Sequence, residues 1–146
     1  MIASNALIEN GGDGGSFSMG SFSGTSHKQE CHSNLLFPEL LKEIFLLEQT
    51  LMPDRAGSST VAINKHATFL PHVDSGAGAG QGVSLIVGLG NYTGGSLMVE
   101  GKQYDIAYRP LEFDGWKERH WTNKFEGERY SLVWFTPQGC ENVKYV

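Results

Sequence analysis

The sequence predicts one small domain that is mainly β, built from short antiparallel strands. From residue 60 onward, short runs rich in β-branched and aromatic residues alternate with turn residues. No helical pattern of 10–15 residues separates these runs, which argues against a parallel α/β sheet. The 19 glycines and 11% aromatic residues are also typical of a turn-rich β protein. The residues alone leave a sandwich, a barrel or a jelly roll open.

The expected strands follow one another closely along the second half of the chain. Their sequences are TVAIN at 60–64, ATFLPH at 67–72, GVSLIVGL at 82–89, SLMVEG at 96–101, QYDIAY at 103–108 and RYSLVWFTP at 129–137. Two polar segments between them, NYTGG at 91–95 and EGKQ at 100–103, are predicted to be hairpin turns.

Residues 1–33 are predicted to be a flexible N-terminal segment, and residues 34–146 the folded domain. The stretch 10–26 is almost entirely glycine and serine, with isolated phenylalanine and methionine. Such a composition offers too little apolar surface to offset the entropy lost on ordering.

An amphipathic helix is expected at residues 35–52, ahead of the strands. Pro38 suits the first turn of a helix, and Pro53 ends it. The helical period places one apolar stripe opposite a polar face; the stripe is Leu36, Leu40, Leu41, Ile44, Leu47 and Leu51. We expect the stripe to pack on the sheet, although the same pattern fits a partner-binding helix.

Charge and composition narrow the classes of function. The net charge of −5 argues against a dedicated nucleic-acid-binding domain, but not against a nucleic-acid substrate. Cys31 and Cys140 lack metal-ligand spacing and are expected to be reduced thiols. The start of the chain has no basic segment followed by an apolar one, and no window reaches about 18 apolar residues. We therefore expect an intracellular protein, in the cytoplasm or nucleus, without a membrane partner.

The stretch FLPHVDSGAG at 69–78 contains the first candidate site. His72 and Asp74 follow an apolar run, and the strand period of two puts both side chains on one face. One more ligand would complete a facial triad of two histidines and a carboxylate, which suits non-heme Fe(II). His120, bracketed by Trp116 and Trp121, is the candidate. The alternative is that His72 and Asp74 are ordinary surface or turn residues.

A second candidate site is Arg129-x-Ser131, nine residues after His120. Period two places both side chains on one face of a strongly apolar strand. A buried arginine requires a carboxylate. The protein could supply one as a core salt bridge, or a bound dicarboxylate could supply it with help from the Ser131 hydroxyl.

In this order and spacing, His72-x-Asp74, His120 and Arg129-x-Ser131 resemble the Fe(II)- and 2-oxoglutarate-dependent dioxygenases. The resemblance covers roughly residues 60–137 and implies a double-stranded β-helix, or jelly roll, with the N-terminal helix packed on it. It implies that His72, Asp74 and His120 bind iron and that Arg129 and Ser131 hold the C5 carboxylate of 2-oxoglutarate. Asn64 lies where several branches of the family carry a polar residue that touches this co-substrate.

The stretches EFDGWKERHW, GERYSLVWFTP and GGSLMVEG look most like the TET/JBP-like branch, in its short algal or protist form. That branch oxidises methyl groups of nucleic-acid bases. The resemblance thus implies hydroxylation of a C–H bond with O2 and 2-oxoglutarate, and a modified base as the substrate. Ascorbate is the alternative co-substrate in this group. A prolyl-type protein hydroxylase, a small-molecule hydroxylase and a non-catalytic jelly-roll binding domain remain alternatives.

Two further features bear on the substrate. Arg109, Lys117, Arg119 and Lys124 lie near His120 in the sequence, interleaved with aromatic residues, and such a mixture can hold a flipped base. The alternative is a solvated strand end. The glycine-rich stretch 75–82 is expected to form a mobile loop beside the metal ligands.

Overall fold

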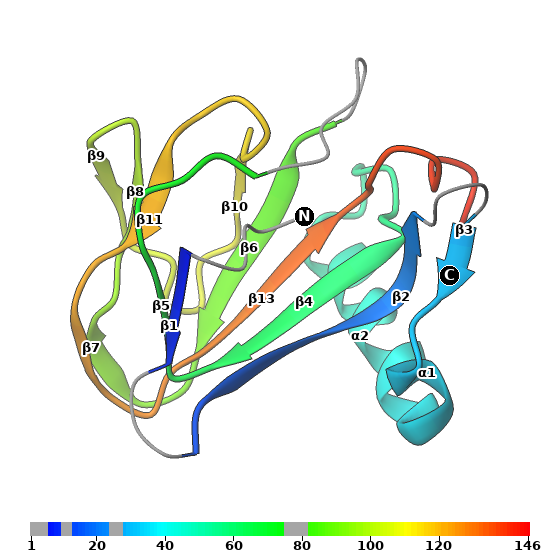
Figure 1. Cartoon of the computed structure of the whole chain (residues 1–146), viewed down its shortest axis with the longest axis horizontal. Coiled ribbons are helices and arrows are strands. Elements are labelled where there is room, and N and C mark those ends of the chain that lie inside the picture. Colours follow the sequence, from blue (N-terminus) through cyan, green and yellow to red (C-terminus); the bar gives the residue numbers. More distant parts are fainter. Residues whose placement is uncertain (1–5, 10–12, 24–27, 75–81) are drawn as a thin grey trace.

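The computed structural model describes residues 6–9, 13–23, 28–74 and 82–146. Within these residues the chain forms two helices and thirteen strands. The strands build one large sheet and a facing layer of smaller sheets, and the helices lie outside the large sheet (Figure 1). The predicted mainly β jelly roll with a helix packed on it is therefore confirmed.

The large sheet has six antiparallel strands in the order β10-β6-β13-β4-β2-β3. Their bounds are β10 Leu111–Phe113, β6 Ser84–Leu89, β13 Tyr130–Phe135, β4 Thr60–Lys65, β2 Gly15–Ser23 and β3 Lys28–Glu30. Ser131 of β13 pairs with Asn64 of β4 on one side and with Gly88 of β6 on the other. These three positions therefore form one row on a single face of the sheet.

The facing layer is made of three smaller sheets, ordered β11-β8-β9, β12-β7 and β1-β5. Their strands are β11 His120–Thr122, β8 Leu97–Val99, β9 Lys102–Tyr104, β12 Phe125–Gly127, β7 Tyr92–Gly94, β1 Leu7–Glu9 and β5 Ala67–Phe69. Just beyond β5, His72 forms an antiparallel bridge with His120 of β11. This bridge brings together two segments that are 48 residues apart in the sequence.

The two faces of the large sheet bury different sets of side chains. Val133 and Phe135 of β13 belong to the core between the sheets, together with Leu97 of β8. Leu132 and Trp134 belong to the core between the large sheet and the helices. The period-two division of this strand expected from the sequence is thus confirmed.

The helical region begins earlier than predicted and is broken once. Helix α1 spans Ser33–Leu36 and helix α2 spans Pro38–Leu51, with Pro38 in the first turn of α2. The Trp134 indole N–H donates to the Ile44 carbonyl at 3.1 Å, which ties α2 to the large sheet.

The apolar stripe predicted for this helix is wrong at two positions. Leu36 and Leu40 are 60% and 39% exposed, whereas Phe45 is buried. The buried face of α2 also contains Glu48, because Arg55 pairs with its carboxylate at 3.0 Å. The spacing of leucines along the helix could not predict that its buried face also contains one residue of an ion pair.

The prediction of a flexible segment over residues 1–33 is wrong for residues 15–23, and so is the domain boundary at residue 34. Strand β2 pairs along six residues with β4, and Met19 is fully buried in the helix-side core. Pairing with β4 satisfies the backbone groups of β2, and small residues permit close approach: a Cβ on Gly20 would lie 2.2 Å from the Ser59 carbonyl oxygen.

The two predicted hairpin turns differ in outcome. Glu100 and Gly101 both have positive φ and connect β8 to β9, as expected for a tight hairpin. The predicted turn at 91–95 is instead strand β7, which pairs with β12.

None of the helices in the described residues is both long and apolar enough to cross a membrane.

Candidate functional site

His72, Asp74 and His120 converge at the junction of β5 and β11. One ligand atom from each lies within 4.8 Å of the others. Asp74 Oδ1 lies 3.2 Å from His72 Nε2 and 3.3 Å from His120 Nε2, and all three side chains are 7% exposed. His72 Nε2 and Asp74 Oδ1 nevertheless have no hydrogen-bond partner among the described residues. Buried polar atoms without partners that point at one place are the arrangement expected of a metal site.

Backbone carbonyls fix the orientation of both imidazoles. His72 Nδ1 lies 2.6 Å from the Leu70 carbonyl oxygen, and His120 Nδ1 lies 2.9 Å from the Glu118 carbonyl oxygen. A carbonyl can only accept, so each Nδ1 carries the proton. In the neutral imidazoles, each Nε2 then directs its lone pair at the convergence point, as in histidines that bind metals.

The electrostatics of this cluster favour a charged carboxylate. Burial alone raises the pKa of Asp74, but contacts with His120 and His72 outweigh it and lower the pKa to about 2. For His120, burial lowers the pKa, and the interaction with Asp74 outweighs this and raises it. Asp74 is therefore ionised at neutral pH and can serve as an anionic ligand.

Gly115 makes room for the metal-ligand cluster. Its carbonyl oxygen accepts a hydrogen bond from the Asp74 backbone N–H at 2.9 Å. A Cβ built on Gly115 would lie 2.6 Å from Asp74 Oδ2 and 3.3 Å from His120 Cε1. No local pattern in the sequence marked this glycine, because the close approach arises only in the fold.

Arg129 is buried at 2% exposure immediately before β13. Its Nη2 donates to the Gly95 carbonyl at 3.0 Å, but its Nε has no partner. The guanidinium carbon lies 5.5 Å from the centroid of the Tyr92 ring and 5.4 Å from that of Phe125. No ion pair with a carboxylate forms among the described residues, so the core salt bridge left open by the sequence is absent there.

Ser131 and Asn64 lie side by side on the inner face of the large sheet. Asn64 Nδ2 lies 3.1 Å from Ser131 Oγ, and Asn64 Oδ1 accepts from the Ser16 hydroxyl at 2.6 Å. Ser131 lines the pocket described below, whereas Asn64 is not among the residues that line it. Asn64 therefore lies behind Ser131. Its other partner, Ser16, belongs to the N-terminal segment that was predicted to be flexible.

A narrow pocket connects the metal-ligand cluster with Arg129. It is lined by residues of both sheet layers, namely Phe69, His72, Asp74, Ile86, Leu97, His120, Trp121, Thr122, Arg129, Ser131 and Val133. The apolar wall includes Ile86 and Leu97. Leu85 and Val87 point instead to the helix-side core, and Val83 is 39% exposed. An unbroken apolar run does not indicate which alternate residues face inward.

The remaining histidines and cations among the described residues do not line this pocket. His66 contacts Asp13 at 3.1 Å, and His32 is exposed. The cations expected near a substrate, Lys117 and Arg119 among them, are exposed; Trp116 is buried and Trp121 half-buried. His27 and most of the predicted loop at 75–82 lie outside the described residues.

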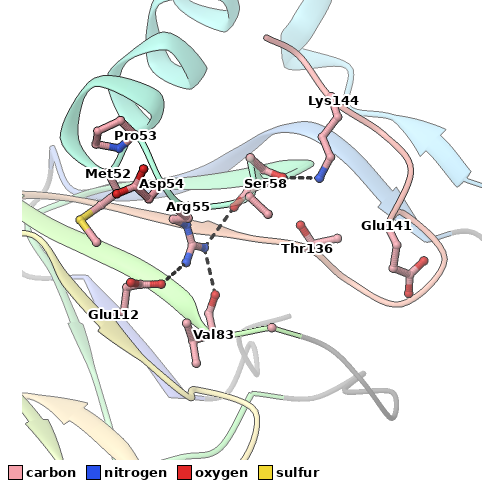
Figure 2. A pocket seen from close by; sticks show the side chains of 13 residues that line it. Met52, Pro53, Asp54, Arg55, Ser58, Val83, Glu112, Thr136, Glu141 and Lys144 are labelled. Carbon is pink, nitrogen blue, oxygen red and sulfur yellow. Dashed lines mark hydrogen bonds and ion pairs between the residues drawn. The ribbon is translucent and has the colours of Figure 1, made fainter.

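A larger cavity, of about 570 Å³, lies at the other end of the large sheet, between the end of α2 and the C-terminal segment (Figure 2). Its central residue, Arg55, is paired with Glu48 at 3.0 Å and Glu112 at 2.8 Å, and donates to the Val83 carbonyl. Its Lys144 donates to the Gly57 carbonyl at 2.5 Å. The principal charges are thus satisfied internally, and the cavity offers no comparable chemistry.

Comparisons with known proteins bear on the fold. No protein-family model and no curated protein matches the sequence. Among solved structures, NgTET1 in complex with 5mC DNA superposes with a TM-score of 0.68 at 15% identity, covering 88% of this chain and 63% of that chain. The chain thus spans less than two thirds of NgTET1.

Two other solved structures are similar. An oxidoreductase of the 2OG-Fe(II) oxygenase family from Burkholderia pseudomallei has a TM-score of 0.53 at 20% identity, covering 82% of this chain and 67% of that one. OsALKBH1 has a TM-score of 0.52 at 9% identity, covering 88% and 82%. At these identities the likeness establishes architecture: the chain has the jelly-roll fold of the 2OG-Fe(II) oxygenases.

Proposed function

We propose that the chain is an Fe(II)- and 2-oxoglutarate-dependent dioxygenase that hydroxylates a C–H bond. The observation that carries the proposal is a single pocket with two unsatisfied ends. One end has the unpartnered ligand atoms His72 Nε2 and Asp74 Oδ1 beside His120, and the other has Arg129 with an unpartnered Nε. A metal ion and a dicarboxylate together would satisfy both ends.

The ligand set fits iron. Two imidazoles and one carboxylate on one side leave several coordination positions free, as in non-heme Fe(II) oxygenases. When bound, iron together with 2-oxoglutarate and O2 supplies the oxidising chemistry that converts R–H to R–OH, with release of succinate and CO2. His72, Asp74 and His120 would hold the metal, and the carbonyls of Leu70 and Glu118 would keep both rings in the required tautomer.

The rest of the pocket positions the co-substrate and excludes water. Arg129 would pair with the C5 carboxylate of 2-oxoglutarate, and the Ser131 hydroxyl would add a hydrogen bond. Asn64 would act through Ser131, by holding its hydroxyl in place. A buried cation without a carboxylate favours the dicarboxylate over ascorbate as co-substrate.

Binding requires the pocket to widen. Its volume in the free chain is about 30 Å³, room for little more than one water molecule. The wall residues Ile86, Leu97 and Val133 are apolar and would keep bulk water from the reacting atoms once the ligand is in place. We expect half-buried Trp121 to move, because it is the largest side chain of the lining that reaches the surface.

For the primary substrate, we propose a methyl group on a nucleic-acid base. Two observations support this choice over a peptide or a small molecule: the similarity in fold to a structure of NgTET1 in complex with 5mC DNA, and the exposed cations at 117, 119 and 124 around β11. Aromatic residues with nearby cations are the means by which an extruded base is held.

The experiment is a titration of Fe(II) into the anaerobic chain, followed by measurement of succinate formed from 2-oxoglutarate and O2. His72→Ala should abolish both metal binding and succinate. His66→Ala is the matched control, because His66 contacts Asp13 and takes no part in the pocket. A wild-type chain that binds no iron and forms no succinate would contradict the proposed enzyme class.

The substrate is tested separately. Methylated cytosine in single-stranded DNA, double-stranded DNA and RNA should be compared with peptide pools, and the oxidised product identified by mass spectrometry. If no base is oxidised while succinate is formed, the nucleic-acid substrate is wrong and the dioxygenase chemistry stands.

A further inference from the structure

An exposed apolar knob lies at the corner where α1 meets α2. Its four side chains are 39–79% exposed, although all are large and apolar; they are Leu35, Leu36, Phe37 and Leu40. Helix packing leaves them uncovered, because the first buried residue of α2 is Ile44. Single exposed apolar residues are ordinary on protein surfaces, whereas a contiguous group of this size marks a binding surface.

A shallow hollow of about 420 Å³ lies beside the knob, on the helix-side face of the large sheet. The apolar residues of its lining are Phe17, Ile63 and Tyr130. The centroid of the Phe17 ring lies 6.0 Å from that of the Phe37 ring, so the knob and the hollow form one continuous surface. The charges of the lining, Asp13 and Lys65, pair with each other at 3.0 Å. Covering the hollow would therefore bury no unpaired charge.

The first half of β2 adds an open sheet edge to this surface. Strand β3 runs beside only the last three residues of β2 (Figure 1). Gly20 bonds through its N–H and its C=O to the Asn34 side chain, and the Ser18 carbonyl accepts from the Ser33 hydroxyl, so these groups face away from β4. Because backbone groups alternate in direction along a strand, those of Ser16 face the same way. Nothing in the described part of the chain pairs with them there, and the segment GSFS at 15–18 has no charge or proline to block a further strand.

We propose that this surface joins two copies of the chain in a two-fold symmetric dimer. If β2 pairs antiparallel with β2 of the partner subunit, Ser16 can lie opposite the partner's Ser16 and exchange both N–H···O bonds with it. The same register puts Ser18 of one copy opposite Gly14 of the other. The knob follows Ser33, which bonds to Ser18, and Gly14 lines the hollow, so each knob faces the hollow of the other copy. A knob and a hollow side by side are the self-complementary arrangement that a two-fold contact requires.

The exposed area agrees with a dimer. The knob and Phe17 together expose roughly 500 Å² of apolar surface, from their exposed fractions and the usual area of such side chains. Two copies would bury about twice this area, and the paired strands and the polar rim would bring the total to about 1,200 Å², where stable interfaces begin. An unrelated partner would have to bring a matching knob and hollow, whereas a second copy already has both.

Sedimentation equilibrium of the full chain over about 1–200 μM tests the dimer. The mass of the wild type should approach twice the chain mass of 16.0 kDa as the concentration rises. Leu36→Glu combined with Leu40→Glu would place charges against both hollows and should raise the dimer Kd at least about a hundredfold. Leu46→Glu is the matched control. Leu46 is 40% exposed and Leu40 39%, but Leu46 lies about 240° further around α2, so its replacement should leave the dimer Kd unchanged.

A second pair of variants tests the strand edge. Ser16→Pro and Ser16→Ala both lose the hydrogen bond from the Ser16 hydroxyl to Asn64, but only proline also removes the N–H at the open edge. Ser16→Pro should therefore raise the dimer Kd about tenfold or more, and Ser16→Ala should dimerise as the wild type does.

Two results would overturn the dimer. A wild-type chain that stays monomeric at the highest concentration would do so, and would leave the surface to a different partner protein. A dimer that persists unchanged in the double leucine variant would have to use another face of the molecule. Leu36 and Leu40 are exposed, so that variant should keep the circular dichroism spectrum and Tm of the wild type, and loss of the dimer is then loss of the contact.

Discussion

Arg129 provides the sharpest test of the pocket, because a buried cation without a carboxylate should weaken the free chain. Its side chain is 2% exposed and has one hydrogen bond, to Gly95 O, and two aromatic faces nearby. Burial of a charge costs several kcal/mol. The hydrogen bond offsets about 2 kcal/mol of this cost, and each aromatic contact offsets about 1 kcal/mol. We estimate a remaining cost of about 1–2 kcal/mol.

Arg129→Met keeps the volume and removes the charge. Without ligand, the variant should therefore be more stable than the wild type by about 1–2 kcal/mol, or about 2–8 °C in Tm for a chain of this size. With 2-oxoglutarate at 100 times its Kd, the wild type should become the more stable of the two. Ligand binding adds about 2.7 kcal/mol to its free energy of unfolding and adds nothing to that of the variant. Urea unfolding with and without 2-oxoglutarate measures both effects.

Arg55→Met is the matched control for this experiment. Arg55 is buried too, but it is paired with Glu48, which is 2% exposed. Removing Arg55 leaves that carboxylate buried and unpaired, so the free energy of unfolding should fall by about 3–5 kcal/mol. If Arg129→Met destabilised the free chain as Arg55→Met does, Arg129 would have a structural partner and the argument for a ligand-binding arginine would be refuted.

Three further predictions concern the metal-ligand cluster. Metal affinity should fall as the pH drops below the raised pKa of His120, approaching about tenfold per pH unit for one displaced proton, and a calorimetric titration that found no pH dependence would contradict this. In the metal-free chain, the contact between His120 and Asp74 adds to the free energy of unfolding. The contribution of His120 is complete below pH 6.5 and is lost as the pH rises through its raised pKa. The contribution of Asp74 is complete above pH 3.8 and is lost as the pH falls towards about 2. The free energy of unfolding should thus decline from pH 6 to pH 9 by an amount that His120→Asn reduces. Gly115→Ala should weaken metal binding about tenfold because its methyl group would press on Asp74, whereas Gly15→Ala, with open space around it, should bind metal normally.

Local periodicity predicted which side chains of the candidate site share a strand face. His72-x-Asp74 and Arg129-x-Ser131 each place two side chains on one strand face, and a strand fixes this relation regardless of what surrounds it. The β-rich texture after residue 60 likewise predicted three of the six strands of the large sheet, namely β4, β6 and β13. Composition failed for β2, since a Gly/Ser-rich segment is ordered here by pairing with β4, a contact between distant parts of the chain.

The chemical meaning of these residues was decided only by tertiary structure. The sequence left Arg129 with two interpretations, and the fold favours one because the groups around it are a carbonyl and two aromatic rings rather than a carboxylate. The clearance at Gly115, beside Asp74 and His120, comes from segments that meet across the jelly roll. Sequence spacing specifies to which face of a strand a side chain points. The distance between side chains on different strands depends on how the sheets pack. Ligand binding depends on that distance, so only the tertiary structure decides it.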